Sequence, residues 1–226
     1  MDTLRSETLK KINRTSEETY KFQGAGIGTG EEASKKYPPD KNSFVLDIGF
    51  GDCKLIKGIA SLTHNLYGID IARASSQLAI KENLLDIGFI PLCLDVSHEK
   101  IPFIDDFFDF VYCLETLEHL SNPFFVFAEI KRVLKHDGKF IITFPMPEKN
   151  LGYEGGKHAH VYPGFLVRNS FERFMMQLYF KLVERTENGD TAWYVFENRK
   201  QNGVIIDTFN VIADNYTEEE LYGWLK

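Results

Sequence analysis

The stretch Phe44-Val-Leu-Asp-Ile-Gly-Phe-Gly-Asp52 contains the feature that decides the fold. A short apolar run ends in a Gly-x-Gly turn, and the helix-like run 54–62 follows it. This order of strand, glycine turn and helix lets the backbone approach a ligand where side chains would collide. A second apolar run ends at Gly68-Ile-Asp70, about twenty residues later, where a carboxylate can accept the hydroxyls of a ribose. The sequence therefore predicts a nucleotide-type site.

One acid distinguishes this turn from a dinucleotide site. Asp47 precedes Gly49 by two residues and so lies inside the turn. Its charge would repel a pyrophosphate, but it would attract a ligand that carries an ammonium and a sulfonium. S-adenosylmethionine is such a ligand, and the pattern favours it over a nicotinamide cofactor.

Length, charge and cysteine usage narrow the class of protein. A chain of 226 residues fits one domain with extensions, and a formal charge of −7 makes nucleic acid an unlikely partner. The first residues, 1–14, lack the apolar core of a signal peptide, and no run approaches the ~20 apolar residues of a membrane span. Cys53, Cys93 and Cys113 are expected to be small buried thiols in a reducing compartment. We therefore expect a soluble cytoplasmic protein with no membrane contact.

Strand-like and helix-like runs alternate along the middle of the chain. Expected strands are 44–48, 65–70, 89–94, 107–114 and 139–144, and expected helices are 54–62, 74–85 and 123–134, with Gly138 as a helix stop. A helix over 164–180 is expected to precede two strands, 181–185 and 191–197, around the turn Asn188-Gly-Asp190. The prediction is an α/β, Rossmann-like, seven-stranded mixed sheet with helices on both faces and a C-terminal antiparallel hairpin.

The flanking segments carry weaker signals. A helix is expected over 7–22, and the glycine cluster Gly24–Gly30 is interpreted as a hinge or lid, because no strand precedes it as a phosphate cradle requires. The polar loop 146–163 is long enough to be functional. A strand over 204–211 and a helix over 217–225 are expected in the tail. The predicted organisation is an N-terminal helix and lid over 1–40, a core over 41–198 and an extension over 199–226.

Together these pieces resemble the class I S-adenosylmethionine-dependent methyltransferases. The matching segments follow the order of the family: Leu46-Asp-Ile-Gly-Phe-Gly51, Gly68-Ile-Asp70, Leu94-Asp95, Phe108-Asp-Phe-Val-Tyr-Cys-Leu-Glu-Thr-Leu-Glu-His-Leu120 with Asn122-Pro123, and Leu134-Lys-His-Asp-Gly-Lys-Phe140. They cover residues 44–145 well and the hairpin to 198 loosely. The chain departs from the family at Cys53, where a third glycine is common.

The resemblance implies a set of cofactor contacts. Gly49 and Gly51 would lie against the ligand, Asp47 would face its methionine end, and Asp70 would bind the ribose. Asp95 would accept from the adenine amino group, with the Val96 N–H beside it, although Asp95 could instead be a helix N-cap. The predicted cofactor set is Asp47, Gly49, Phe50, Gly51, Asp70, Ile71, Asp95, Val96 and Cys113.

Glu115, Glu118 and His119 follow the fourth strand at helical spacing, so we expect them on one face of a turn at the carboxyl edge of the sheet. The loop 146–163 adds His158 and His160. Carboxylates and imidazoles suit Mg²⁺, Mn²⁺, Fe²⁺ or Zn²⁺. The Glu-x-x-Glu-His pattern resembles that of ubiquinone-pathway O-methyltransferases and small-RNA 2′-O-methyltransferases, in which it holds a divalent metal. Predicted metal ligands are Glu115, Glu118, His119 and His160, and predicted catalytic residues are Glu115, His119 and His158.

A metal-free interpretation stays open, in which Glu118 lies on a solvated helix face and His119 lines the pocket or acts as a base. The expected function is O-methylation of a small hydroxylated metabolite, a saccharide or a phenol. The alternatives are N-methylation of a small amine, RNA 2′-O-methylation, and a non-catalytic methyltransferase-like module. The sequence leaves the choice between monomer and homodimer open.

Overall fold

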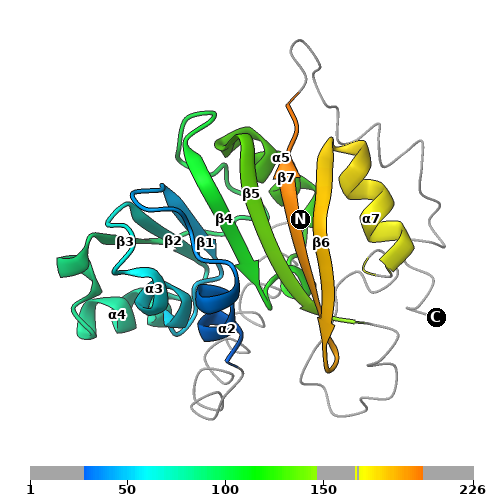
Figure 1. Cartoon of the computed structure of the whole chain (residues 1–226). Helices are drawn as coiled ribbons and strands as arrows, with labels where there is room; N and C mark the ends of the chain where they lie inside the picture. The colour runs from blue at the N-terminus through cyan, green and yellow to red at the C-terminus, as the bar shows by residue number, and fades with distance from the viewer. Residues whose placement is uncertain (1–27, 147–165, 167, 201–226) are drawn as a thin grey trace. The chain divides into compact units, whose positions relative to one another are not determined.

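The computed structural model describes residues 28–146, 166 and 168–200. It contains a seven-stranded mixed sheet with the strand order β3-β2-β1-β4-β5-β7-β6, which confirms the predicted fold class (Figure 1). The chain divides into two compact units, Met1–Val96 and Ser97–Lys226. The expected elements at 7–22, 204–211 and 217–225 lie outside the described residues, and the predicted boundaries at 40 and 198 stay predictions. None of the described helices is long and apolar enough to cross a bilayer.

The first unit is built on parallel strands, with β2 hydrogen-bonded between β1 and β3. Its elements are α2 (Thr29–Lys36), β1 (Val45–Ile48), α3 (Lys54–Ile59), β2 (Leu66–Asp70), α4 (Arg73–Lys81), the 3-10 helix η1 (Leu84–Ile87) and β3 (Phe89–Cys93). The helix expected over 74–85 is therefore too long. Asn83 adopts a left-handed φ of 57°, which ends the α-helix and starts the separate 3-10 turn.

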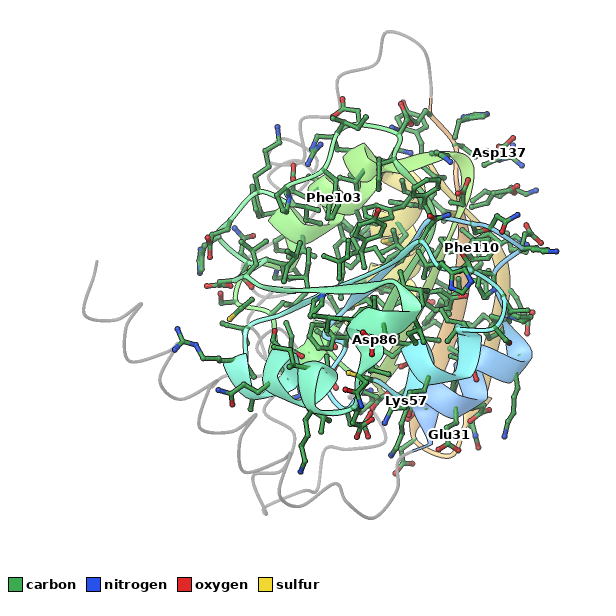
Figure 2. The ribbon with its side chains drawn as sticks, turned by 90° about the vertical axis from the view of Figure 1, so that its left-hand side faces the viewer. Glu31, Lys57, Asp86, Phe103, Phe110 and Asp137 are labelled. Atoms are coloured by element: carbon green, nitrogen blue, oxygen red, sulfur yellow. The ribbon has the colours of Figure 1, made fainter. Side chains whose placement is uncertain are left out.

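The glycine cluster does not end in a hinge, because Thr29 and Gly30 lie in the first turn of α2. Gly30 instead allows α2 and α3 to pack closely, since a Cβ there would lie 2.8 Å from the backbone nitrogen of Leu55. Figure 2 labels one residue on each of these helices, Glu31 on α2 and Lys57 on α3. The glycine is thus needed for helix packing, a requirement that only the folded structure displays.

Gly58 on α3 makes a second close approach, and it yields a stability prediction. A Cβ at Gly58 would lie 2.3 Å from Ser34 Oγ and 2.5 Å from Ser34 Cβ on α2. We expect Gly58→Ala to destabilise the protein by about 1–2 kcal/mol, because overpacking outweighs the gain in helix propensity. Thermal unfolding measures this. The double variant Gly58→Ala, Ser34→Gly should recover most of the loss, and additive effects of the two substitutions would contradict the predicted clash.

The second unit combines a parallel pair with an antiparallel hairpin. Its elements are β4 (Phe108–Leu114), the 3-10 helix η2 (Leu117–His119), α5 (Pro123–Val133), β5 (Leu134–Pro145), α7 (Arg168–Gln177), β6 (Phe180–Asn188) and β7 (Thr191–Asn198). β4 pairs in parallel with β5, and β7 lies antiparallel between β5 and β6. The predicted hairpin is confirmed. Helix α7 is shorter than the predicted range 164–180, and within the described residues it gives way to β6 at Phe180.

Helix α5 begins where the sequence places it and ends without the expected glycine. The Asn122 side chain accepts a hydrogen bond from the Phe125 N–H at 3.2 Å, and Pro123 occupies the first turn. Leu134 is already extended and starts β5. Gly138 is therefore not a helix stop. It lies inside a bulge of β5, next to Asp137, which is labelled in Figure 2. Asp137 has a left-handed φ of 61°. A Cβ at Gly138 would lie 2.8 Å from the Leu134 side chain.

Aromatic side chains fill the core of the second unit. Phe127 of α5 contacts Phe140 of β5 and Phe171 and Phe174 of α7, so both helices cover the same face of the sheet. Figure 1 shows α7 running beside β6. Nearly every residue of β4 and β7 is buried on both faces, as a covered sheet requires. This packing fixes the positions of β4 and β5, and therefore of the polar residues at their carboxyl ends.

Candidate functional site

The glycine turn after β1 has the backbone that a ligand cradle needs. Gly49 and Gly51 have φ values of 76° and 45°, a left-handed conformation that side chains disfavour. The Gly49 N–H donates to the carbonyl of Ile69 on β2 at 2.7 Å, which fixes the start of the turn. A Cβ at Gly51 would meet nothing in the described part of the chain closer than the Gly49 oxygen at 3.8 Å, so no described residue crowds that side of the turn.

Cys53, which stands where the family often has glycine, adopts a φ of 61°. This conformation costs a non-glycine residue about 1–2 kcal/mol, which explains the usual preference for glycine. Burial raises the pKa of the Cys53 thiol to about 12, so the thiol is inert at neutral pH. Cys113 is buried as predicted, but Cys93 is exposed because it is the last residue of the edge strand β3.

Asp70, the acid at the end of β2, is held in place by the turn. Its two carboxylate oxygens accept hydrogen bonds from the Gly51 N–H at 2.9 Å and from the Ala72 N–H at 2.7 Å. Burial raises the pKa of Asp70, while these two N–H groups and the Ser75 hydroxyl oppose the rise. A carboxylate can accept about four hydrogen bonds, so the Asp70 carboxylate can still accept one from a ligand hydroxyl.

Asp47 is buried at the end of β1, with only 3% of its surface exposed. Burial raises its pKa to about 8, and the nearby charges of Asp70 and Asp52 add to the rise. Among the described residues, no positive charge opposes this rise for the ionised form. A ligand with a positive charge would supply one, which is the property that distinguishes S-adenosylmethionine from a pyrophosphate-containing cofactor.

This pKa predicts that cofactor binding releases protons. Below pH of about 8 the Asp47 carboxyl is largely protonated, and a cationic ligand favours its ionised form. The affinity for the cationic cofactor should therefore rise with pH until about 8. Over the same interval the stability of the free protein should fall, because the folded state holds the Asp47 proton more tightly than the unfolded chain does. Titration calorimetry in two buffers of different ionisation enthalpy measures the released protons. Asp47→Asn should remove most of the buffer dependence, and a heat that is independent of the buffer in the unsubstituted protein would contradict the prediction.

The other predicted cofactor residues fall into two groups. Phe50, Val96 and Cys113 are buried, and the Phe50 ring packs edge-on against Phe89 at 5.3 Å. Asp95 follows β3 and Ile71 follows β2, and both are partly exposed. No helix begins at Asp95, so its interpretation as a helix N-cap is wrong. Cofactor contact by this set stays a prediction, and Phe50 would contribute through its backbone because its ring belongs to the core.

Glu115 is the first residue after β4 and has a strained backbone. Its φ is 50°, a left-handed value rare for a glutamate and common at functional sites. Its N–H donates both to the carbonyl oxygen of Thr143 at 3.1 Å and to the Thr143 hydroxyl oxygen at 3.0 Å, on neighbouring β5. Burial raises the pKa of Glu115 to about 7, while a hydrogen bond between its side chain and Thr143 opposes the rise. Thr143 thus fixes the Glu115 carboxyl group.

Glu118 is buried to 1% exposure in η2. No other described residue donates a hydrogen bond to either of its carboxylate oxygens, and the same holds for Glu115 Oε1. Burial raises the Glu118 pKa well above its usual range, and the charge of Glu115 adds to the rise, while a hydrogen bond with the Glu118 backbone opposes it. His119 Nε2 lies 3.7 Å from Glu118 Oε1, with 36% of the His119 side chain exposed. The two glutamates therefore interact as a buried carboxyl pair with unmet hydrogen-bonding capacity.

The expected helical face for Glu115, Glu118 and His119 is wrong in detail. Only Leu117–His119 form a 3-10 turn, and Glu115 precedes it in a left-handed conformation. The alternative that puts Glu118 on a solvated helix face is also wrong, because the side chain is buried. Sequence reasoning missed Thr143, although a polar residue in the apolar strand Lys139–Phe144 was the available signal.

The described residues supply only part of the predicted metal site. No group of three or more His, Cys, Asp or Glu side chains within 28–146, 166 and 168–200 could hold a metal ion. His158 and His160 lie outside this range. The carboxyl pair fits a divalent ion in ligand chemistry, but not in ligand number, and the metal stays a prediction.

Comparison with known proteins agrees with this geometry. A family model described as a methyltransferase domain matches residues 46–142. A sterol 4-C-methyltransferase of Caenorhabditis elegans is 33% identical over 132 residues, 54% of this chain and 38% of that protein. A ubiquinone biosynthesis O-methyltransferase of Glaesserella parasuis is 32% identical over 103 residues, 44% of each chain. A crystal structure of an Aquifex aeolicus SAM-dependent methyltransferase superposes with a TM-score of 0.59 and 21% identity, covering 74% of this chain and 88% of that one.

Residues 46–142 of the chain therefore form a class I S-adenosylmethionine-dependent methyltransferase domain. Its match spans less than half the length of the two curated relatives named above. By their names, the matched proteins include methyltransferases that act at carbon, at oxygen and at nitrogen. Family membership thus leaves the acceptor atom to be argued from the residues of this chain.

Proposed function

We propose that this protein transfers a methyl group from S-adenosylmethionine to a hydroxyl oxygen of a small metabolite. The observation that carries the proposal is the buried pair Glu115 and Glu118 directly after β4, in which Glu115 Oε1 and both Glu118 oxygens receive no hydrogen bond from another described residue. A hydroxyl acceptor must lose its proton as it attacks, and a buried carboxylate with a pKa near neutrality is suited to accept it. An amine acceptor needs no such group once it is held in its neutral form.

The reaction divides between two sets of residues. Asp47, Asp70 and the glycine turn bind and orient the cationic donor. The acceptor oxygen forms a bond to the methyl carbon as the bond from carbon to sulfur breaks, and the sulfonium becomes a neutral thioether. The hydroxyl proton passes to the Glu115 carboxylate. Alignment of the two reactants supplies roughly 7–11 kcal/mol of the barrier reduction in well-oriented reactions.

Two measurements on the full chain test the proposal. Titration calorimetry should detect binding of S-adenosylmethionine and of its demethylated product. A panel of hydroxylated metabolites and amines, incubated with radiolabelled methyl donor, should give labelled ethers. Absence of heat with both cofactors would favour the non-catalytic module, and label found only in amines would favour N-methylation.

The divalent metal at Glu115, Glu118, His119 and His160 is a separate prediction. A metal bound there would orient substrate oxygens and lower the pKa of a bound hydroxyl. The same panel is run after exhaustive chelation and again with added Mg²⁺, Mn²⁺, Fe²⁺ or Zn²⁺. Full activity after chelation, with no metal in the purified protein, would contradict this prediction without affecting the proposed methyl transfer.

A further inference from the structure

Two hydrogen bonds join the loop that follows β3 to the loop that follows β4. Ser97 Oγ accepts a hydrogen bond from the Ser121 N–H at 3.2 Å. The Ser121 hydroxyl is hydrogen-bonded to His98 Nε2 at 3.0 Å, and either tautomer of the imidazole allows this bond, because a hydroxyl both donates and accepts. Neighbouring residues of one loop thus hold both the backbone and the side chain of Ser121. We call Ser97, His98 and Ser121 the serine–histidine clasp.

The serine–histidine clasp lies next to candidate site residues in both loops. The predicted adenine contacts, residues 95–96, directly precede Ser97 in the chain. The 3-10 helix η2, which carries Glu118, ends two residues before Ser121. Ser97 is only 4% exposed, so its hydrogen bond with Ser121 is shielded from competing water. The clasp therefore connects a predicted cofactor segment to a proposed acceptor segment.

The 3-10 helix η2 is a single turn, and it needs contacts from outside to stay ordered. The His119 N–H donates to the Thr116 carbonyl at 3.0 Å, and the Leu120 N–H donates to the Leu117 carbonyl at 3.2 Å. These bonds span three residues, and such bonds have poorer geometry than those of an α-helix. An isolated turn is marginal in water, so tertiary contacts supply its stability. The clasp supplies one at the carboxyl end of η2.

We propose that the serine–histidine clasp positions η2 for methyl transfer and makes the order of η2 depend on the cofactor. Its three members are positioning residues, because they act through the residues beside them. Adenine bound by residues 95–96 restrains the start of the loop after β3, and the two hydrogen bonds carry that restraint to η2. The inference rests on the proposed function for the role of Glu118, and it adds that the cofactor prepares the acceptor side of the site before the acceptor binds.

Amide hydrogen exchange on the full chain, with and without saturating S-adenosylhomocysteine, tests this coupling. The reporters for η2 are the N–H groups of His119, Leu120 and Ser121, and those of Gly49 and Gly51 report binding at the glycine turn. We expect the ligand to slow exchange at the η2 reporters on the order of fivefold to a hundredfold, the range typical of coupling between sites. Absence of binding would overturn the proposed function and this inference together. Binding without slower exchange at the η2 reporters would overturn the inference alone.

Variants show whether the protection passes through the serine–histidine clasp. Ser121→Ala removes the bond to His98, and the double variant Ser97→Ala, His98→Ala removes both bonds. The protection that the ligand gives to the η2 reporters should fall about fivefold or more in the double variant, whereas the glycine turn stays protected. Ser121→Thr keeps the hydroxyl and should retain the protection. Undiminished protection in the double variant would overturn the inference, and if that variant fails to fold, undiminished protection in Ser121→Ala would do so.

The matched control is His64→Ala. His64 is also exposed, and its Nδ1 lies at hydrogen-bond distance, 3.1 Å, from the Ile87 carbonyl oxygen. Because this bond involves neither loop of the clasp, the substitution should leave exchange at both sets of reporters unchanged. Turnover with the acceptor panel should fall about tenfold or more in the double variant, since a misplaced group near the reacting atoms slows the reaction strongly, and it should be retained in Ser121→Thr. Unchanged turnover in the double variant would overturn the positioning role.

Discussion

Asp70→Ala should weaken binding of S-adenosylmethionine by on the order of a hundredfold. The carboxylate is the acid predicted to bind the ribose, and hydrogen bonds to a charged group contribute about 1.5–3 kcal/mol each. The substitution also removes the partner of the Gly51 and Ala72 N–H groups, so the turn itself loses its support. Titration calorimetry with S-adenosylmethionine and S-adenosylhomocysteine measures the change.

Two further variants separate the loss of the ligand contact from the loss of the turn. Asp70→Asn keeps one oxygen for a backbone N–H while the charge is lost, so it should bind more weakly than the unsubstituted protein and more tightly than Asp70→Ala. Asp52→Asn removes a neighbouring acid whose side chain is 40% exposed and pairs with Lys54, and it should change affinity little. Unaltered cofactor affinity in Asp70→Ala would refute the assigned role of Asp70.

The sequence predicts the candidate cofactor residues from local chemistry, and the structure shows the turn conformation that this prediction requires at Gly49 and Gly51. Gly49 and Gly51 need their φ values in the turn itself, and Asp70 is placed by the end of a short strand. The strand and helix order follows from apolar runs in the same way. These features can be predicted from one sequence, because each depends on residues within about twenty positions in the chain.

The arrangement of the residues proposed to contact the methyl acceptor is harder to predict from the sequence, because contacts between residues distant in the chain determine it. Glu115 and Thr143 are 28 positions apart, and their contact follows from the register of β4 and β5. The burial of Glu118, against the expectation of a solvated helix face, depends on the same packing. Gly30 and Gly138 were misinterpreted for the same reason, since each glycine is required by a side chain or backbone segment that approaches it only in the folded chain.

Glu118→Leu should stabilise the ligand-free protein and abolish methyl transfer. Each unmade hydrogen bond of a buried acceptor costs about 1–3 kcal/mol, and Glu118 has two such oxygens. Leucine has a similar volume and no polar atom, so we expect a gain of about 1–3 kcal/mol in the free energy of unfolding. Because the Glu118 pKa is raised in the folded state, the folded protein keeps a proton that the unfolded chain releases above a pH of 4.5, so the free energy of unfolding falls as pH rises further. The gain should therefore grow with pH.

The chain contains a matched control, the buried glutamate Glu129 on α5. Its carboxylate accepts hydrogen bonds from the Ile101 N–H at 2.8 Å and from Arg132 Nε and NH2 at 2.9 and 2.7 Å. Glu129→Leu leaves these buried N–H donors without an acceptor and should destabilise the protein by about 3–5 kcal/mol. Two Glu→Leu substitutions in one unit are thus expected to change stability in opposite directions.

The opposite signs separate an acid kept for function from one kept for structure. Turnover in Glu118→Leu and Glu118→Gln should fall by on the order of a hundredfold or more, with affinity for S-adenosylhomocysteine unchanged, because the site retains its cofactor residues and loses an acceptor contact. His119→Ala should likewise lower turnover more than cofactor affinity. If the Glu118→Leu protein unfolds at a lower temperature than the unsubstituted protein, Glu118 stabilises the fold. The assignment of Glu115 and Glu118 to binding of the methyl acceptor would then be refuted.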